Sequence, residues 1–303
     1  MSDTVQARPV AVIGAGAIGL ALASAMARSG HSVSICGARQ RIDEVRITES
    51  GVTEGWAVNH LGSPRDARTA STVIVAVKAH HTAAIGDWLC AFDHPNTTVI
   101  VAQNGVEQRE RVTPYLSRAE IVPAVMYLNV ERTAPGEATL RRVGDTDLAV
   151  GTDPASLAVA AALIGGGMPV VTESDLVTVA WAKLLTNITA NPLTALTGRR
   201  AEVMRDVEIA DLARALMAEA AMIGRAEGAA LTDAHVDRAL GWLQNVPEGS
   251  TTSMRQDRLA GRAMEHDALT GAILRAGDRH GIPAPTNRII YALLNAVRDE
   301  VTP

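Results

Sequence analysis

Aromatic and cysteine side chains are scarce in this sequence of 303 residues. Aromatic residues make up 3% of the chain, so a core has to be built from Ala, Val, Leu and Ile. The two cysteines, Cys36 and Cys90, give no disulfide framework, and no spacing of Cys and His resembles a zinc site. We therefore expect two buried free thiols, a reducing compartment and no bound metal.

The chain also lacks an excess of positive charge and a long apolar run. Its formal net charge of −5 offers no basic field to nucleic acid or to an anionic membrane. No apolar run approaches the length of a membrane span, and the N-terminus lacks a charged-then-apolar signal. We expect a soluble, cytoplasmic protein with no nucleic-acid or membrane partner, long enough for two domains.

A glycine-rich turn stands between an expected strand and an expected helix near the N-terminus. Val10 to Ile13 is a short apolar run, and an Ala- and Leu-rich segment continues to Arg28. The intervening G-x-G-x-x-G pattern is typical of dinucleotide binding, in which the first glycine allows the turn, the second admits the pyrophosphate and the third lets the helix pack closely. The helix N-terminus adds free N–H groups for phosphate. The expected cofactor contacts are Gly14, Ala15, Gly16, Ala17, Ile18 and Gly19.

The segment after the next expected strand, Ser32 to Cys36, favours a phosphorylated cofactor. No acidic residue closes this strand to hold the ribose hydroxyls of NAD. Arg39 and Arg41 follow instead, and a guanidinium suits a 2′-phosphate. The sequence therefore predicts NADPH (NADP+), with Arg39 as a contact. Asp43 and Glu44 remain alternative ribose ligands if the loop folds them back.

Two further apolar runs, Thr72 to Val77 and Thr98 to Ala102, are typical of parallel strands covered on both faces. Ligands of open α/β sheets lie beyond the carboxyl ends of such strands, so Lys78 and Asn104 are candidate contacts to cofactor or substrate. Asn104 is neutral and can both donate and accept hydrogen bonds. Taken alone, however, the Asn-Gly dipeptide is more typical of a plain turn than of a binding site.

The later chain changes from strands to helices. Apolar residues recur at helical spacing after Glu173. We expect an α/β fold with a Rossmann-type dinucleotide-binding domain over residues 1–172, followed by an all-helical domain for substrate and catalysis over residues 173–303. Glu120 to Asn129 and Ala138 to Val150 are expected as further strands, and Asp147 to Gly151 and Pro169 to Thr172 are expected to finish the sheet. One of the late helices is expected over Asp257 to Asp278.

Trp181 to Leu196, WAKLLTNITANPLTAL, is a mostly apolar segment with one polar row. Lys183, Asn187 and Asn191 are four residues apart, which keeps them on nearly one face of a helix. An ammonium can give up a proton and two amides can hold a polar ligand, although such a row is also typical of a solvated helix face. Pro192 predicts a kink or a break at this point.

Five segments resemble the ketopantoate reductase family (2-dehydropantoate 2-reductases) in order and spacing. They are GAGAIG, VKAHHT, QNGVE, WAKLLTNITANPLTAL and TTSMRQD…MEHDA, and the resemblance covers essentially the whole chain. It implies NADPH-dependent reduction of a 2-oxo acid to a 2-hydroxy acid, with ketopantoate, of pantothenate biosynthesis, as the first substrate to test. The apolar helical domain permits a homodimer without requiring one.

The resemblance also implies roles for matching side chains. Lys183 would protonate the carbonyl oxygen as hydride reaches the carbon, Glu265 would support the geometry of the site, and Lys78 would contact the cofactor. Ser253 would contact the substrate carboxylate. Burial lowers the pKa of a lysine and a nearby carboxylate raises it, so Glu265 is expected to help keep Lys183 charged. The asparagines that would line the pocket are Asn104, Asn187 and Asn191.

The sequence departs from the family pattern at three places. Arg39 comes one residue late, Ser250 stands where members often have a substrate-binding asparagine, and Thr197 to Ala201 replaces a polar residue. Ser250 is still a candidate substrate contact, and the departures leave room for another 2-oxo acid. Two alternatives remain: a related two-domain dehydrogenase, against which the WxKLLxN segment argues, and an NADPH-binding sensor without turnover, against which the retained Lys183 argues.

Overall fold

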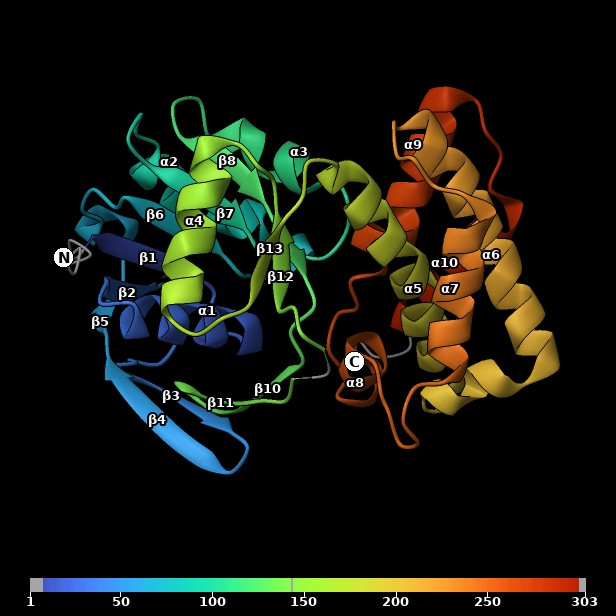
Figure 1. Cartoon of the computed structure of the whole chain (residues 1–303), viewed down its shortest axis with the longest axis horizontal. Helices are drawn as coiled ribbons and strands as arrows, with labels where there is room; N and C mark the ends of the chain where they lie inside the picture. Colours follow the sequence, from blue (N-terminus) through green and yellow to red (C-terminus); the bar gives the residue numbers. More distant parts are fainter. Residues whose placement is uncertain (1–7, 143, 300–303) are drawn as a thin grey trace. The chain divides into compact units, whose positions relative to one another are not determined.

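The computed structural model describes residues 8–142 and 144–299, and the chain divides into two compact units. The first unit runs to Asn104 and resumes over Gln108–Leu176, whereas the second takes Gly105–Glu107 and the chain from Val177 onward. Figure 1 shows strands and helices in the first unit and, over the described residues, helices in the second.

A six-stranded parallel sheet with the order β5-β2-β1-β6-β7-β8 forms the centre of the first unit. Ile13 pairs with Cys36 on one side and with Val75 on the other, and Val75 pairs with Val101. The carboxyl ends of these four strands therefore lie in register along one edge. The strands are β1 (Pro9–Ile13), β2 (Ser32–Cys36), β5 (Asn59–Leu61), β6 (Thr72–Val75), β7 (Thr98–Val101) and β8 (Glu120–Pro123).

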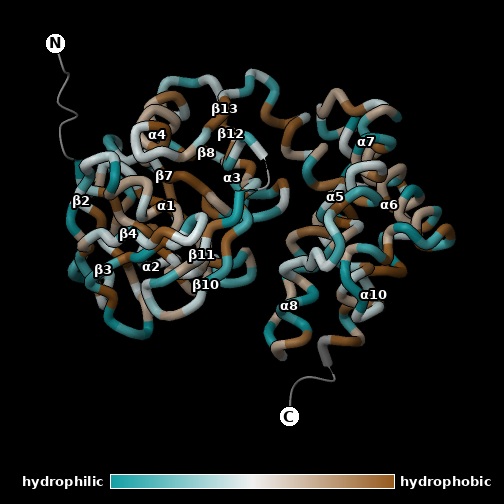
Figure 2. The backbone as a smooth tube through the Cα atoms, turned by 60° about the horizontal axis from the view of Figure 1, so that its bottom comes forward, coloured by the Kyte–Doolittle hydropathy of each residue, from teal (hydrophilic) through white to brown (hydrophobic). Residues whose placement is uncertain are grey.

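Alternate residues of the central strands enter two different cores. Val10 and Val12 pack with α1 (Ala17–Arg28) and α4 (Pro154–Gly165). Ala11 and Ile13 pack on the other face with α2 (Gly86–Phe92). Because both faces are covered, these strands are largely apolar, and the run of β7 appears in brown in Figure 2.

The two cysteines differ, which corrects the expectation of two buried thiols. Cys36 is buried in the sheet, and burial raises the pKa of its thiol to about 12. Cys90 is exposed, because α2 turns its apolar face, with Leu89 and Phe92, toward the sheet.

Two smaller sheets complete the strands of the first unit. One of them contains the expected strands Asp147 to Gly151 and Pro169 to Thr172, so the expectation that these finish the parallel sheet was wrong. The start of the expected strand Glu120 to Asn129 does join the parallel sheet, as β8. The chain leaves the parallel sheet at Ala124, where the side-chain amide of Gln108 binds both main-chain groups. Its Oε1 accepts from the N–H of Ala124 over 3.1 Å, and its Nε2 donates to the carbonyl over 2.8 Å. One sheet pairs β10 (Val130–Ala134), β11 (Glu137–Leu140), β3 (Glu44–Glu49) and β4 (Val52–Ala57). The other pairs β13 (Val170–Thr172), β12 (Leu148–Val150) and β9 (Val125–Met126).

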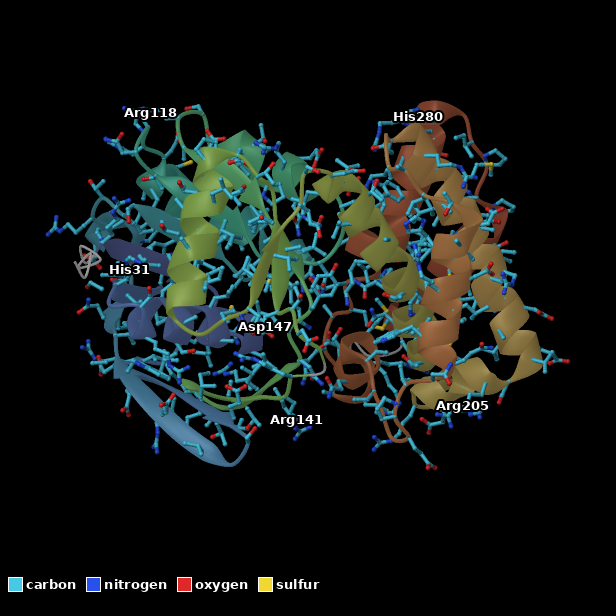
Figure 3. The ribbon with its side chains drawn as sticks, in the orientation of Figure 1. His31, Arg118, Arg141, Asp147, Arg205 and His280 are labelled. Carbon is cyan, nitrogen blue, oxygen red and sulfur yellow. The ribbon has the colours of Figure 1, made fainter. Side chains whose placement is uncertain are left out.

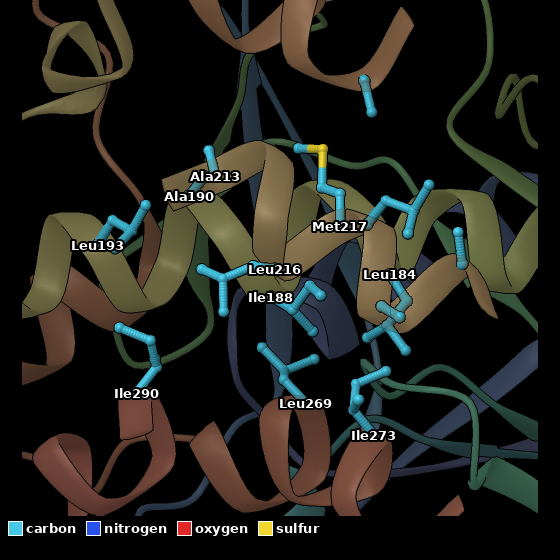
Figure 4. Packing of buried hydrophobic residues seen from close by; sticks show 14 of the residues in the cluster. Leu184, Ile188, Ala190, Leu193, Ala213, Leu216, Met217, Leu269, Ile273 and Ile290 are labelled. Carbon is cyan, nitrogen blue, oxygen red and sulfur yellow. The ribbon is translucent and has the colours of Figure 1, made fainter. Parts of the chain in front are cut away.

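The second unit packs its helices around α5 (Leu176–Thr197). Figure 4 shows Leu184 and Ile188 of α5 against Leu216 of the sixth helix and Leu269 of a later segment. No helix among the described residues is both long and apolar enough to cross a bilayer. The remaining α-helices are α3 (Gln108–Val112) in the first unit and α6 (Val207–Ala226), α7 (Asp233–Gln244), α8 (Ser253–Leu259), α9 (Ala272–His280) and α10 (Pro285–Asp299) in the second. Short 3-10 turns cover Pro64–Asp66, Ala79–His81, Ala83–Ile85, Thr113–Tyr115 and Ala201–Arg205, and a π-helical turn covers Asp267–Gly271.

Helix α5 continues through Pro192, which excludes the break that the sequence allowed, whereas a kink there stays a prediction. A proline inside a helix costs about 3 kcal/mol. Burial of a large apolar side chain contributes about 1.5–3 kcal/mol, and Leu184, Leu185, Ile188 and Leu193 are all buried. Their combined contribution outweighs the local cost of the proline.

The helix expected over Asp257 to Asp278 is in fact interrupted. Gly261 has a φ of 62°, in the left-handed region, and Arg262 donates its N–H to the carbonyl of Asp257 over 2.8 Å. This is the glycine-terminated helix end that closes α8 at Leu259. Helical structure resumes only at His266, directly after Glu265.

Candidate active site

The three glycines of the turn after β1 have different surroundings. Gly14 has a φ of 113°, and a Cβ there would lie 2.6 Å from the main-chain nitrogen of Val77. A Cβ on Gly19 would lie 1.8 Å from the carbonyl oxygen of Gly14. A Cβ on Gly16 would meet nothing within 4 Å. The fold therefore requires the first and third glycines, whereas the second borders open space.

Gly16 is also the N-cap of α1, and it supplies no side-chain hydrogen bond to the first turn, which contains no acidic residue. The N–H groups of this turn, in the segment with Ala17 and Ile18, are thus suited to an anion. Open space beside an uncapped helix start fits the pyrophosphate of a dinucleotide.

Lys78 and Asn104 lie just beyond the carboxyl ends of β6 and β7, on the edge that also carries the glycine turn. Both residues are half-buried. The loops that carry them are joined by Gln103, whose Nε2 donates to the carbonyl of Val77 and to Oγ1 of Thr82, each over 2.9 Å. Gln103 is 3% exposed, and we did not single it out from the sequence. A polar residue directly after an apolar strand was the available signal.

The segment after β2 distinguishes its two arginines. Arg41 binds Asp43 through two contacts of 2.8 Å, so the charged groups of both side chains are already paired with each other. Arg39 is exposed and makes no hydrogen bond or ion pair with another described residue. Glu44 begins β3. Of the two arginines, Arg39 is therefore the one whose guanidinium is not held by a neighbouring carboxylate, and its contact with a 2′-phosphate stays a prediction.

The polar row of α5 is less exposed than a solvated helix face would be. Lys183 and Asn187 are half-buried, and Asn191 is 8% exposed. Burial lowers the pKa of Lys183, which makes its ammonium a stronger acid. Lys78 and Lys183 are the only lysines in the chain, which has 28 lysine and arginine residues. Arginine cannot give up its proton in a protein, so the scarcity of lysine was a further sequence signal that pointed to Lys183 as a proton donor.

Asn191 connects α5 to the start of α8. Its Oδ1 accepts from Oγ of Ser253 over 3.3 Å and from the N–H of Met254 over 3.4 Å. The hydroxyls of Thr194 and Thr252 lie 2.6 Å apart, and Thr252 is the N-cap of α8. The structure thus brings together two predicted substrate contacts, Asn191 and Ser253. The threonine pair was not recognised from the sequence.

Ser250 lies in the loop before α8, and its hydroxyl donates to the carbonyl of Pro247 over 2.5 Å. Its own carbonyl accepts from the N–H of Ala201 over 2.9 Å. Arg205 anchors the start of this loop by donating to the carbonyls of Gln244 and Val246 over 3.0 and 2.9 Å (Figure 3). The hydroxyl of Ser250 is therefore turned toward its own loop, and it takes no part in the contact between Asn191 and Ser253.

Glu265 is half-buried and directly precedes His266, where the helix resumes. Its expected effect on the charge of Lys183 stays a prediction. A separate cavity of about 310 Å³ in the first unit lies over the later half of α1 and strands β3 and β4, with Arg28 and Trp56 in its wall. None of the predicted site residues lines it.

Two family models match the chain: "Ketopantoate reductase PanE/ApbA" over residues 10–153 and "Ketopantoate reductase PanE/ApbA C terminal" over residues 175–298. The chain belongs to the ketopantoate reductase family. It is similar to the 2-dehydropantoate 2-reductase of Mycobacterium tuberculosis, with 36% identity over 292 residues, 96% of this chain and 98% of that protein. The enzyme of the same name from Caulobacter vibrioides is 36% identical over 288 residues, 95% of this chain and 98% of its own.

Solved structures of the ketopantoate reductase family share the fold. The crystal structure from Ralstonia eutropha matches with a TM-score of 0.87 at 29% identity, covering 97% of this chain and 99% of that one. Two more distant structures show the fold alone. They are a dimeric ketopantoate reductase from Staphylococcus aureus (TM-score 0.83, 24% identity) and a D-mandelate dehydrogenase with NADH and anilino(oxo)acetate (TM-score 0.84, 18% identity).

These findings confirm the family and the expected fold class, a Rossmann-type α/β part followed by a helical part. The protein is an oxidoreductase of a dinucleotide-dependent family whose named relatives reduce a 2-oxo acid to a hydroxy acid.

Proposed function

We propose that this protein reduces 2-dehydropantoate (ketopantoate) to pantoate with NADPH, and that Lys183 donates the proton. The observation that carries the proposal is the placement of Lys183 on the central, buried helix α5, where burial lowers its pKa. Its curated relatives at 36% identity carry the name of this reaction. NADPH would supply the hydride, held by the glycine turn, Lys78 and Arg39.

The proton donor has to act on a developing negative charge. Addition of hydride to the carbonyl carbon turns the carbonyl oxygen into an alkoxide. The ammonium of Lys183 would first donate a hydrogen bond to this oxygen and then transfer the proton to it. Because burial lowers the pKa of Lys183, the transfer is easier than from an exposed lysine.

The substrate carboxylate would be held by neutral donors. The main-chain N–H of Met254 can only donate, so it fixes Oδ1 of Asn191 as an acceptor and leaves Nδ2 of that amide to face elsewhere. No described residue accepts from this Nδ2. Asn191 would therefore donate to the carboxylate, together with Asn187 and Asn104. Ser253 would join them by turning its one hydroxyl proton from Oδ1 of Asn191 to the carboxylate. Glu265 would support the geometry of the site.

The first test is the loss of NADPH absorbance with ketopantoate and a panel of other 2-oxo acids. Loss of a positioned general acid costs about a hundredfold to ten-thousandfold in rate, so Lys183→Ala should lose turnover while still binding NADPH. Thr178→Ala, on the same helix outside the polar row, serves as the control. Turnover of wild-type protein that survives Lys183→Ala would contradict the assigned proton donor.

The panel also separates the alternatives. If another 2-oxo acid turns over and ketopantoate does not, the mechanism stands and Ser250 is the first residue to examine. Ser250→Asn, which restores the side chain common in the family, should then raise activity on ketopantoate. NADPH binding without turnover of any acid would reject the reductase and favour a sensor.

A further inference from the structure

One guanidinium in the second unit bonds two segments that are far apart in the sequence. Arg275 of α9 donates from Nε to Oε1 of Glu107 over 3.0 Å and from Nη2 to Oε2 over 2.6 Å. It also donates from Nη1 to Oδ1 of Asp267 over 3.0 Å and from Nη2 to the carbonyl of Asp267 over 2.9 Å. Only the planar fork of arginine makes this set of bonds, and its charge strengthens them.

Glu107 depends on this partner. Its carboxylate is only 17% exposed, whereas the side chain of Arg275 is 42% exposed. A carboxylate removed from water is costly unless a cation pairs with it. Arg279 lies 4.0 Å from Glu107 but makes its 3.0 Å contact with Glu227, which also binds His280 over 2.7 Å (Figure 3). Arg275 is therefore the principal counterion of Glu107.

The first bonded segment directly follows Asn104. Gly105–Glu107 belongs to the second unit, although the chain on both sides of it belongs to the first. The carbonyl of Asn104 accepts from Nη2 of Arg111 over 2.8 Å. Arg111 thus holds the carbonyl of Asn104 itself, and Arg275 holds the carboxylate of Glu107, three residues later in the chain.

The second bonded segment follows Glu265. Asp267 begins the π-helical turn, and its Oδ1 also accepts from the hydroxyl of Tyr291 over 2.9 Å. Gly271 makes room for the cluster, because a Cβ there would lie 2.6 Å from Oδ1 of Asp267 and 3.1 Å from Nη1 of Arg275. Turns of this kind recur at functional sites.

We propose that Arg275 is a positioning residue for the reduction. By bonding Glu107 and Asp267 it fixes the main chain that follows Asn104 and the main chain that follows Glu265. The inference rests on the proposed function, which gives Asn104 and Glu265 their roles toward the substrate. Loss of the guanidinium releases both segments and lowers kcat, whereas the glycine turn that binds NADPH belongs to the other unit and keeps its affinity.

The test compares Arg275→Gln with Arg288→Gln, which removes the same charge from an exposed pair with Asp278 at 3.0 Å. Small misplacements in a site cost up to about a hundredfold in rate. We expect Arg275→Gln to lower kcat by about tenfold to a hundredfold and to leave KM for NADPH unchanged. Hydrogen–deuterium exchange should rise in peptides covering residues 105–107 and 265–271, and Arg288→Gln should show neither change.

Further variants keep the result interpretable if Arg275→Gln folds poorly. Arg275→Lys retains the charge but not the fork, so it should remain impaired. The double change Arg275→Gln with Glu107→Gln removes the unpaired carboxylate, so it should recover thermal stability without recovering kcat. A merely structural role predicts that kcat recovers with stability.

Two results would overturn the proposal in distinguishable ways. Wild-type turnover together with Arg275→Gln kinetics or exchange like those of Arg288→Gln would remove the role of Arg275 and leave the proposed function intact. Absence of wild-type turnover on every 2-oxo acid would remove both, and the exchange data would then show only whether the clamp exists.

Discussion

The glycine turn of the first unit and the α5–α8 region of the second place opposite requirements on their side chains. At Gly14 and Gly19 the requirement is the absence of a side chain, set by contacts within the turn and with the main chain just after β6, whereas Gly16 borders open space. On α5 the requirement is specific side chains, and Asn191 gains its orientation from the main-chain N–H of Met254, 63 residues away. A requirement that the local backbone sets can be recognised in a short sequence motif. A requirement that depends on contacts between distant residues can be recognised from the sequence only in part.

The largest expected effect separates two glycines of the same turn. Gly19→Ala would place a methyl group against the carbonyl of Gly14, which overpacks the strand–helix contact and should cost about 3 kcal/mol of unfolding free energy. Gly16→Ala meets no protein atom within 4 Å, so the melting temperature should hold while NADPH affinity falls. Thermal denaturation and fluorescence titration with NADPH test both. Equal losses of stability in the two variants would contradict the division of roles.

The matching test on α5 compares two asparagines. Asn191→Ala leaves the buried N–H of Met254 without its acceptor, which costs about 1–3 kcal/mol, and it also removes a proposed substrate contact. Asn187→Ala, one turn earlier and half-buried, should raise KM for the 2-oxo acid with little change in stability. Denaturant unfolding together with steady-state kinetics distinguishes them. If Asn187→Ala proved as destabilising as Asn191→Ala, the structural part of this contrast would be wrong.

The parts of the fold that rest on local patterns were predictable. The runs around Val75 and Val101 are apolar because both faces of the sheet are covered, and the first helix follows its glycines directly. The strands after Pro123 were not predictable. They are short, and the point where the chain leaves the parallel sheet is set by the amide of Gln108, which no periodicity reveals.

The failures in the second unit have a physical cause as well. Pro192 was weighed by its local cost, whereas the burial of four large apolar side chains decides the outcome. Gly261 follows the end of α8 in a left-handed conformation, and a glycine at such a position is typical of a helix end. In the candidate site the polar row of α5 could be predicted from the sequence. Its contact with Ser253 and the bonds from Arg275 to Glu107 could not, because they depend on tertiary packing.

A smaller effect is expected in the pH dependence of kcat, through the protonation of Lys183. Burial lowers its pKa below the ordinary value of 10.5. The donor must be protonated, so kcat for reduction should fall as pH rises through the lowered pKa, and oxidation of the hydroxy acid should rise over the same range. Stability should increase there too, because the unfolded chain still binds the proton that the folded chain has lost.

Two lysines make this measurement direct. Reductive methylation with ¹³C-formaldehyde labels Lys78, Lys183 and the N-terminus, and NMR titration then reports each pKa separately. Lys183→Ala assigns the signal. A Lys183 signal that titrates at or above 10.5 would be inconsistent with its burial, whatever the kinetics show.

The smallest effect tests Arg39, the side chain proposed to make the protein prefer NADPH over NADH. Arg39 is exposed and makes no ion pair with another described residue, so its removal should leave stability unchanged. If it binds the 2′-phosphate, Arg39→Ala should raise KM for NADPH about tenfold, roughly 1.4 kcal/mol, and leave KM for NADH unaltered. Arg41→Ala is the matched control, because Arg41 is already bound to Asp43. An equal response to both cofactors would assign the preference to another residue.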